Sequence, residues 1–267
     1  MKLSVVIPAH NEEDLLPSCL ASLRRAARAL PGTPVHVVVV ADACRDRTAQ
    51  VARRGGAAVV ATGARNVGAA RAAGVREVLR RTRQLDPADV WLAMTDADTT
   101  VPVRWLRCQS AYADQGWDAV VGTVRVTDWS GYRPETRTLF RSRYGADGGP
   151  HSHGLHSHVH GANLGVRAAA YLLAGGFPDV PTAEDHGLVA ALAAGGGRVL
   201  RTRTLAVVTS ARREARAPDG FSRYLTSLDA EDLDGPVLDG AGLHRAGVDG
   251  GLGRAGLDPA ELDPATV

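Results

Sequence analysis

The chain has 267 residues, of which 45% are hydrophobic and 22% charged, a composition typical of a soluble globular protein. It argues against fibrous and wholly disordered proteins, and no run of 18 apolar residues predicts a membrane span. The formal net charge of +2 combines a basic body with an acidic end, because nine acids and two arginines lie from Asp229 onwards, so that residues 1–228 carry about +9 and the rest about −7.

The three cysteines, Cys19, Cys44 and Cys108, are far apart and show no Cys-x-x-Cys spacing. This spacing indicates neither a disulfide framework nor a zinc site, and it fits a reducing cytosol. The apolar start of the chain is too short, and too soon followed by acids, to be a signal peptide. We therefore expect a cytoplasmic protein, which could work peripherally at a membrane.

Short apolar runs alternate with helical patterns through the first hundred residues. A strand over Leu3–Pro8 precedes a helix whose leucines recur at three and four positions up to Leu30. Further buried strands are predicted at Val35–Ala41, Ala57–Ala61 and Val90–Met94, with helical segments between them. Such alternation predicts an α/β fold with a largely parallel sheet.

Polar residues follow these predicted strands. Asn11 and Glu12 come after the first strand, at a helix N-terminus that could hold a ligand's polar groups, although helix capping would explain them equally well. Asp42 ends the second strand. After the third strand, small residues surround Arg65 and Arg71, and these two arginines could neutralise phosphate at a helix terminus. The alternative is a plain loop followed by an alanine-rich helix.

Two acids, Asp96 and Asp98, stand one residue apart at the end of the fourth strand. Open α/β sheets keep their ligands at this edge, and two neighbouring carboxylates repel each other unless a cation lies between them. Carboxylate oxygens suit Mg²⁺ or Mn²⁺ better than Zn²⁺. The alternative is that both acids only cap the next helix, around Val103–Ala113.

The second half of the chain is less regular. Ala119–Thr127 alternates apolar and polar residues, which predicts a half-exposed strand. Arg133, Arg137 and Arg141 recur every four residues and would line one helix face, as a solvated surface or as a binding site. The aromatic residues Trp117, Trp129, Tyr132 and Tyr144 lie in the region where an acceptor could stack, or belong to the core.

Residues 151–160 hold five of the nine histidines. Alternating histidines on a strand would place several imidazoles on one face, where a metal is conceivable, whereas the Gly and Ser content favours a loop without a specific metal. A further strand is expected at Gly161–Val166.

Glu184 and Asp185 precede an amphipathic helix, and Asp185 could be a helix cap and nothing more. A strand or hairpin is expected at Val199–Thr209 and a helix at Phe221–Leu228. The loop between them carries Arg212, Arg213 and Arg216, which could hold a diphosphate or an anionic acceptor, or be solvated. Residues 229–267 are rich in Gly, Asp, Pro and Ala and predict a disordered tail.

Taken together, several motifs occur in a specific order: Val5 to Glu13 (Val-Val-Ile-Pro-Ala-His-Asn-Glu-Glu), Asp42, Asn66 to Arg71, Asp96-Ala-Asp98, Gly176-Phe177 and Glu184-Asp185. In this order and spacing, residues 1–228 resemble the family 2 glycosyltransferases of the GT-A fold. The resemblance implies a Rossmann-like, mostly parallel sheet flanked by helices, with a nucleotide-binding half at 1–100 and an acceptor and catalytic half at 101–228.

The resemblance also implies a reaction. A single sugar would pass from a UDP- or GDP-sugar to an acceptor hydroxyl, on an anionic or lipid-linked acceptor, with inversion. Pro8, Ala9 and Glu12 would border the nucleoside, Asp42 would accept a hydrogen bond from the base, Arg71 would lie near the donor and Asp96 near the ribose. Asp98 would hold Mg²⁺ or Mn²⁺, and in the catalytic pair Glu184-Asp185 the second acid would be the general base.

Other readings make different demands on the sequence. No GxGxxG motif follows the first strand, and no P-loop is possible because Lys2 is the only lysine. The Gln-x-x-Arg-Trp motif of processive synthases is also absent, which favours single transfer, and no nucleic-acid partner is expected. The alternatives kept are a non-catalytic module that binds nucleotide sugars and a sugar nucleotidyltransferase. A third metal ligand is not evident, because only His186 and His244 follow Asp185.

Overall fold

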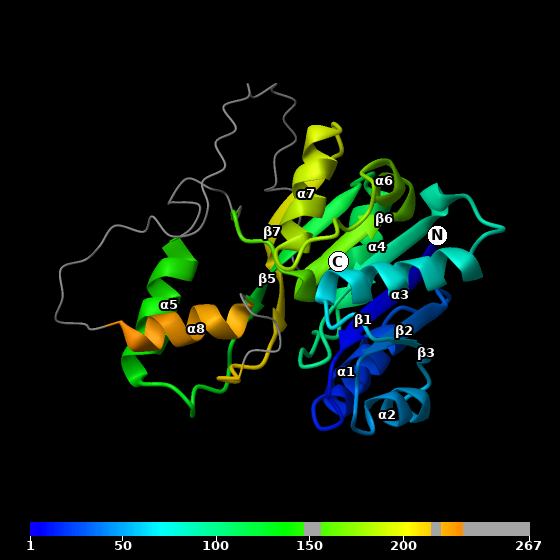
Figure 1. Cartoon of the computed structure of the whole chain (residues 1–267). Coiled ribbons are helices and arrows are strands. Elements are labelled where there is room, and N and C mark those ends of the chain that lie inside the picture. Colours follow the sequence, from blue (N-terminus) through cyan, green and yellow to red (C-terminus); the bar gives the residue numbers. More distant parts are fainter. Residues whose placement is uncertain (147–155, 215–219, 232–267) are drawn as a thin grey trace.

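The computed structural model describes residues 1–146, 156–214 and 220–231 (Figure 1). Seven strands form one sheet in the order β3-β2-β1-β4-β6-β5-β7. All neighbouring strands run parallel except that β6 is antiparallel to both β4 and β5. The strands are β1 (Lys2–Ala9), β2 (Val35–Asp42), β3 (Ala58–Thr62), β4 (Val90–Met94), β5 (Ala119–Arg125), β6 (Leu164–Arg167) and β7 (Val199–Val208). The mostly parallel sheet predicted from the alternating pattern is therefore confirmed.

Helices cover both faces of the sheet (Figure 1). They are α1 (Leu16–Arg28), α2 (Thr48–Arg54), α3 (Val67–Arg81), α4 (Trp105–Asp114), α5 (Pro134–Ala146), α6 (Ala168–Leu173), α7 (Glu184–Ala194) and α8 (Phe221–Ala230). Two short 3₁₀ turns, η1 (Pro87–Asp89) and η2 (Gly161–Asn163), precede β4 and β6. None of the helices in the described ranges is long and apolar enough to cross a bilayer.

Side chains of β1 show how the two layers form. Val5 and Ile7 point into the core built with α1 and α4, whereas Val6 packs on the other face with α3 residues such as Val75. All of these side chains are fully buried. Burial on both faces explains why the parallel strands read as continuous apolar runs in the sequence.

The half-exposed strand predicted at Ala119–Thr127 is wrong. In β5 only Arg125 is exposed, because the strand lies between β6 and β7 and both of its faces are covered. Val121 packs with the α3 and α7 side, and Val120 and Val124 pack in the opposite core. The strand expected from Gly161 is also shorter than predicted, since residues 161–163 form η2 and β6 begins at Leu164.

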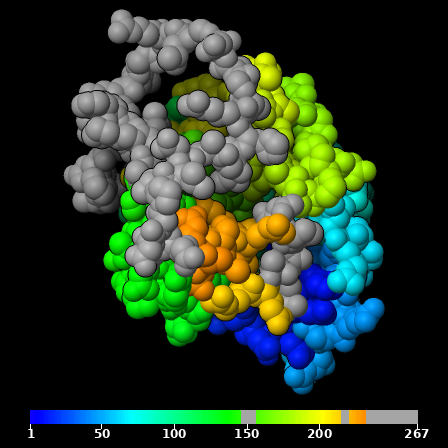
Figure 2. Space-filling model, turned by 60° about the vertical axis from the view of Figure 1, so that its left-hand side comes forward, coloured from blue at the N-terminus to red at the C-terminus, as the bar shows by residue number. Residues whose placement is uncertain are grey.

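Helices α5 and α8 pack against each other beside the main sheet (Figure 1), and in Figure 2 α8 (orange) lies between α5 (green) and the segment after β7 (yellow). The Phe140 ring stacks on Tyr144 and meets the edge of Phe221, with centroids 4.8 and 5.9 Å apart. The Asp229 carboxylate accepts hydrogen bonds from Thr136 Oγ1 at 2.5 Å and the Arg213 guanidinium at 2.7 Å. Asp229 therefore belongs to the folded body, two residues of α8 lie beyond the boundary expected at 228, and the remaining tail, 232–267, is outside the described residues.

Candidate functional site

Left-handed backbone marks one edge of the sheet. Within the described residues, four non-glycine residues have positive φ: Asn11 (53°), Ala43 (48°), Arg65 (49°) and Ala183 (60°). The first three follow the carboxyl ends of β1, β2 and β3, and Ala183 is the N-cap of α7. This conformation costs an L residue about 1–2 kcal/mol, and such residues concentrate at functional sites. The carboxyl edge is therefore the candidate site.

A buried arginine joins two of the predicted site residues there. Arg71 of α3 donates from Nη2 to Asp96 Oδ1 at 2.6 Å and from Nη1 to Glu184 Oε1. The Arg71 side chain is only 5% exposed and that of Glu184 only 4%. The structure thus brings together three residues that are far apart in the sequence, one from α3, one after β4 and one from α7. We call Arg71, Asp96 and Glu184 the Arg71 cluster.

Two glycines make room for the Arg71 cluster. A Cβ atom on Gly161 would lie 2.3 Å from Arg71 Cζ, and a Cβ atom on Gly68 would lie 2.8 Å from Glu184 Cγ. Both distances are far below van der Waals contact. The sequence analysis expected the small residues of this segment to let a ligand come close. In the structure, Gly68 instead lets the Glu184 side chain come close.

The charges of the cluster stabilise each other. Burial by itself lowers the pKa of Arg71, but the charges of Asp96 and Glu184 outweigh burial and raise it above its usual value. Burial raises the pKa of Asp96, the Arg71 charge opposes that rise, and the Asp98 charge adds to it. Arg71 therefore stays protonated, and its Nε atom has no hydrogen-bond partner among the described residues.

A second arginine bridges the other pair of acids. Arg212 contacts Asp98 Oδ2 through Nη2 and, at 3.2 Å, through Nε, and its Nη1 lies 2.8 Å from Glu12 Oε1. The side chains of Glu12, Asp98 and Arg212 are 7%, 15% and 17% exposed. The other oxygen of Asp98 accepts from Thr99 Oγ1 at 3.2 Å. The arginine loop that the sequence analysis left open is therefore part of the site through Arg212, whereas Arg216 lies outside the described residues.

A metal at Asp98 has to be judged on these donors. The described ranges contain no group of three His, Cys, Asp or Glu side chains that could hold a metal. Mg²⁺ in proteins is commonly held by one or two carboxylates, with substrate phosphates and water as its other ligands. The donor set at Asp98 fits a cation of that kind, held jointly with a diphosphate, and does not fit a cage made by the protein alone.

Asp185 lies in the first turn of α7, next to Glu184 of the Arg71 cluster. Its Oδ2 accepts from the Gly161 amide at 2.7 Å and its Oδ1 from the His186 amide at 2.8 Å. The first of these bonds fixes the carboxylate against η2, and each oxygen keeps a second lone pair. The side chain is half-buried, so a proton acceptor can be offered at the edge of the site.

The Asp42 carboxylate stabilises the turn between β3 and α3. Its Oδ1 accepts from Thr62 Oγ1 at 2.7 Å and from the Arg65 amide at 3.0 Å, and its Oδ2 accepts from the Asn66 amide at 2.9 Å. These bonds close the turn between β3 and α3. Hydrogen bonding to a nucleotide base stays a prediction and would use the remaining lone pair of Oδ2. β1 extends one residue beyond the predicted end at Pro8, so that Pro8 and Ala9 are both buried beside β2. Their contact with a nucleoside stays a prediction.

The histidine segment contributes a stack of rings that the sequence analysis did not place in the site. The His156, His158 and His160 imidazoles follow one another with centroids 5.8 and 5.9 Å apart, and Tyr144 stacks on His158 at 3.8 Å. The Tyr144 hydroxyl lies 2.9 Å from His160 Nε2. Burial lowers the pKa of His160 to about 3, so the ring is neutral. The alternating spacing of the histidines in the sequence predicted several imidazole rings on one face. Two of the five histidines of the segment, His151 and His153, are outside the described residues.

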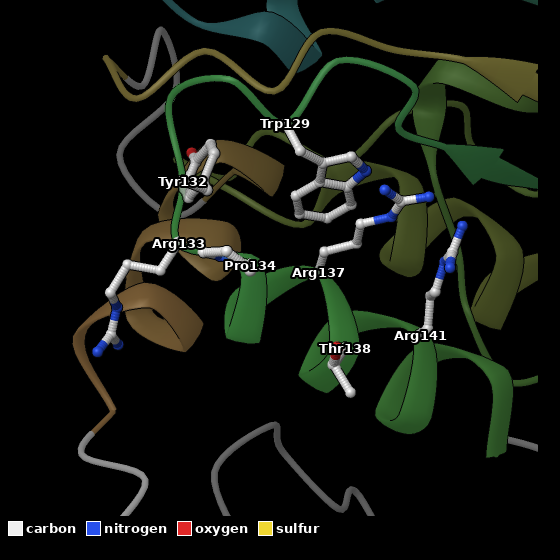
Figure 3. Close-up of a pocket in the computed structure, with 7 residues that line it drawn as sticks. All are labelled: Trp129, Tyr132, Arg133, Pro134, Arg137, Thr138 and Arg141. Carbon is white, nitrogen blue, oxygen red and sulfur yellow. The ribbon is translucent and has the colours of Figure 1, made fainter.

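An open pocket of about 470 Å³ lies at the start of α5 (Figure 3). Its lining residues are Trp129, Tyr132, Arg133, Pro134, Arg137, Thr138 and Arg141. In Figure 3 the guanidinium groups of Arg137 and Arg141 point to the same side, beside the Trp129 ring, whereas Arg133 points away from them. Arg133 bonds to Asp229 and Glu231, but Arg137 and Arg141 have no carboxylate partner among the described residues. The pocket therefore combines an aromatic wall with two uncompensated positive charges.

Known proteins share the fold. The mannosyltransferase PcManGT from Pyrobaculum calidifontis, solved with GDP-Man and Mn²⁺, has a TM-score of 0.59 at 20% identity, covering 80% of this chain and 58% of that one. S. aureus TarS in complex with UDP-GlcNAc has a TM-score of 0.56 at 19% identity, covering 83% and 62%. At these identities the likeness shows the fold, which is the GT-A fold expected from the resemblance.

Sequence relatives match shorter stretches. The dolichyl-phosphate beta-glucosyltransferase of Drosophila melanogaster is 43% identical over 56 residues, which is 20% of this chain and 17% of that protein. The undecaprenyl-phosphate 4-deoxy-4-formamido-L-arabinose transferase of Pseudomonas paraeruginosa is 38% identical over 128 residues, which is 46% of this chain and 35% of that protein. The matched stretches therefore cover only about a sixth of the first relative and about a third of the second. The model of the family described as glycosyl transferase family 2 matches residues 4–171, more than half of the chain, and the chain belongs to that family.

Proposed function

We propose that this protein is a metal-dependent glycosyltransferase that moves one sugar from a UDP- or GDP-sugar to an acceptor, with inversion. The observation that carries the proposal is the meeting, at the carboxyl edge of the sheet, of the Arg71 cluster, Asp98 and Asp185. Family membership and structural neighbours solved with GDP-Man and UDP-GlcNAc support a nucleotide-sugar donor.

The chemistry assigns a task to each group. Cleavage of the bond between the anomeric carbon and the donor phosphate leaves negative charge on the diphosphate, and Mg²⁺ or Mn²⁺ bound at Asp98 would stabilise that charge as a Lewis acid. Asp96 would bind the ribose, while Arg71 holds Asp96 and Glu184 in place. If the acceptor is a hydroxyl, Asp185 would accept its proton as the new bond forms, and the bond of Asp185 to the Gly161 amide orients it for this role.

The pocket at the start of α5 is the candidate acceptor site. Its aromatic wall suits an apolar or sugar-like group, and Arg137 and Arg141, which have no carboxylate partner within the described part of the chain, suit an anion. Two relatives are named for dolichyl-phosphate and undecaprenyl-phosphate, which favours an acceptor with a phosphate on a lipid. Such an acceptor would bring the protein to a membrane surface.

The test is donor turnover with Mg²⁺ and Mn²⁺, followed by mass spectrometry of the products, for UDP-glucose, UDP-N-acetylglucosamine and GDP-mannose. Metal-dependent transfer from one of these donors supports the proposal. Donor binding without turnover on a broad acceptor panel would favour the inert binding module, and release of pyrophosphate from a nucleoside triphosphate and a sugar phosphate would favour a nucleotidyltransferase.

Asp185→Asn separates the two acceptor chemistries. For a hydroxyl acceptor, turnover should fall by about 100-fold or more with donor affinity unchanged, because a general base is lost. A phosphate acceptor is already ionised near neutral pH and needs no base, so a polyprenyl-phosphate reaction should hardly slow. Unchanged turnover with a hydroxyl acceptor would remove Asp185 from the mechanism.

A further inference from the structure

Arg212 is a charged side chain of the candidate site that comes from the segment after β7. It reaches two acids from different segments, Glu12 after β1 and Asp98 after β4. Burial alone lowers the pKa of Arg212, but the charges and hydrogen bonds of Asp98 and Glu12 together outweigh burial and raise it. The guanidinium thus holds the position of a cation between two carboxylates in a largely buried place.

The same oxygen of Asp98 cannot serve Arg212 and a metal equally. Both nitrogen contacts from Arg212 go to Oδ2. A divalent cation bound there would lie within a few ångström of a positive guanidinium in a site of reduced dielectric, where like charges repel strongly. Hydrogen bonds to charged groups are worth about 1.5–3 kcal/mol each, so displacing Arg212 without a new anion is costly.

The surroundings allow the guanidinium to move while the acid stays. Asp98 is held by Thr99 and Thr209, and Thr100 forms an antiparallel bridge with Val208. The Arg212 backbone is also held, since its amide donates to Ser210 Oγ at 3.2 Å and its carbonyl accepts from Tyr132 Oη at 3.3 Å. The guanidinium can therefore leave Asp98 by rotation about the Arg212 side-chain bonds alone.

We propose that Arg212 is an exchangeable cation of the donor site. In the donor-free protein it neutralises Asp98 and Glu12 and competes with the metal for Asp98. When a nucleoside diphosphate group enters with the metal, the guanidinium leaves Asp98 and donates to the diphosphate oxygens, where it adds a positive charge next to the leaving group. This inference rests on the proposed function for the identity of the ligand, but the competition at Asp98 does not.

The exchange makes two predictions of opposite sign for Arg212→Ala. Binding of Mn²⁺ alone, measured by electron paramagnetic resonance of the free ion, should tighten by about tenfold or more because the competing charge is gone. Binding of UDP or GDP in saturating Mn²⁺, measured by calorimetry, should weaken by about tenfold because a diphosphate contact is lost. A residue that only stabilises the fold would not produce this pair of opposite shifts.

Matched variants complete the test. Arg213→Ala removes the same charge from the next residue, whose guanidinium contacts Asp229 and the Gly131 carbonyl, and should leave both affinities unchanged. Arg212→Lys keeps the charge and should restore metal competition. Arg212→Gln, which is neutral but keeps part of the aliphatic stem and a polar end, serves if the alanine variant is poorly folded, and should repeat the tighter Mn²⁺ binding.

Three outcomes would overturn the inference. Mn²⁺ binding that is unchanged or weaker in both neutral variants would show that Arg212 does not compete for Asp98. Nucleotide binding that is unchanged in both would show that the guanidinium does not pass to the diphosphate. Equal shifts in Arg213→Ala would trace the effect to the loop. Failure of the proposed function is distinguishable, since then the wild type would turn over no donor while the neutral variants still bound Mn²⁺ more tightly.

Discussion

Gly161→Ala tests the geometry of the Arg71 cluster. The added Cβ would lie 2.3 Å from Arg71 Cζ and 2.4 and 2.6 Å from its two terminal nitrogens. Normal contact needs about 3.4–4 Å, so the guanidinium has to retreat by roughly 1 Å or more. A retreat of that size breaks the 2.6 Å bond to Asp96 and leaves buried charges incompletely paired.

The expected cost follows from that loss. Breaking a buried ion pair by removing a partner costs about 3–5 kcal/mol, and partial relaxation should reduce the loss for Gly161→Ala to about 2–3 kcal/mol in the free energy of unfolding. Urea denaturation measures this value, and donor binding should weaken in parallel because Asp96 loses its orientation. Gly145→Ala is the control, since its Cβ meets no atom within 4 Å and alanine favours a helix. A Gly161→Ala protein as stable as wild type, with unchanged donor affinity, would refute the role given to the cluster.

Three further predictions concern separate parts of the site. Asp98→Ala should abolish the metal dependence of UDP or GDP binding while the protein stays folded, as calorimetry with and without Mn²⁺ would show, and retained dependence would place the metal elsewhere. The folded pKa of His160 is about 3, below the unfolded value, so the stability that this residue contributes is complete above about pH 6.5 and is lost as the pH falls towards 3. The free energy of unfolding of the wild type should therefore fall by about 2 kcal/mol between pH 7 and pH 5, and that of His160→Gln should fall less. Urea denaturation at both pH values measures the difference. Ala43→Gly relieves a φ of 48° and should stabilise the protein by up to about 1 kcal/mol, and a loss of stability would mean that the alanine is not strained.

Local patterns were enough to predict the sheet and the edge at which the site lies. The alternation of strands and helices up to Asp98 is encoded in short runs, each with its own period, and parallel strands place their carboxyl ends together. The position of Asp96 and Asp98 after β4 follows from that rule alone. The prediction failed for β5, because an alternating sequence does not reveal that both faces are covered by distant elements.

Pairings between distant residues were beyond sequence reasoning. Arg212 and Asp98 are 114 residues apart, and Arg71 and Glu184 are 113 residues apart. Nothing in a local pattern selects one arginine of a chain with 31 basic residues as the partner of a given acid. The tight packing of Gly161 on Arg71 is likewise visible only once η2 and α3 lie against each other.

The most direct measurement of the central claim is a crystal structure of the protein with Mn²⁺ and UDP or GDP, with anomalous scattering used to locate the metal. The account predicts an anomalous peak at about 2.2 Å from a carboxylate oxygen of Asp98, with diphosphate oxygens as further ligands. It also predicts that Asp185 faces the side of the donor site where the sugar would lie. A bound nucleotide with no peak at Asp98, or with the Asp185 carboxylate turned away from the diphosphate, would contradict it.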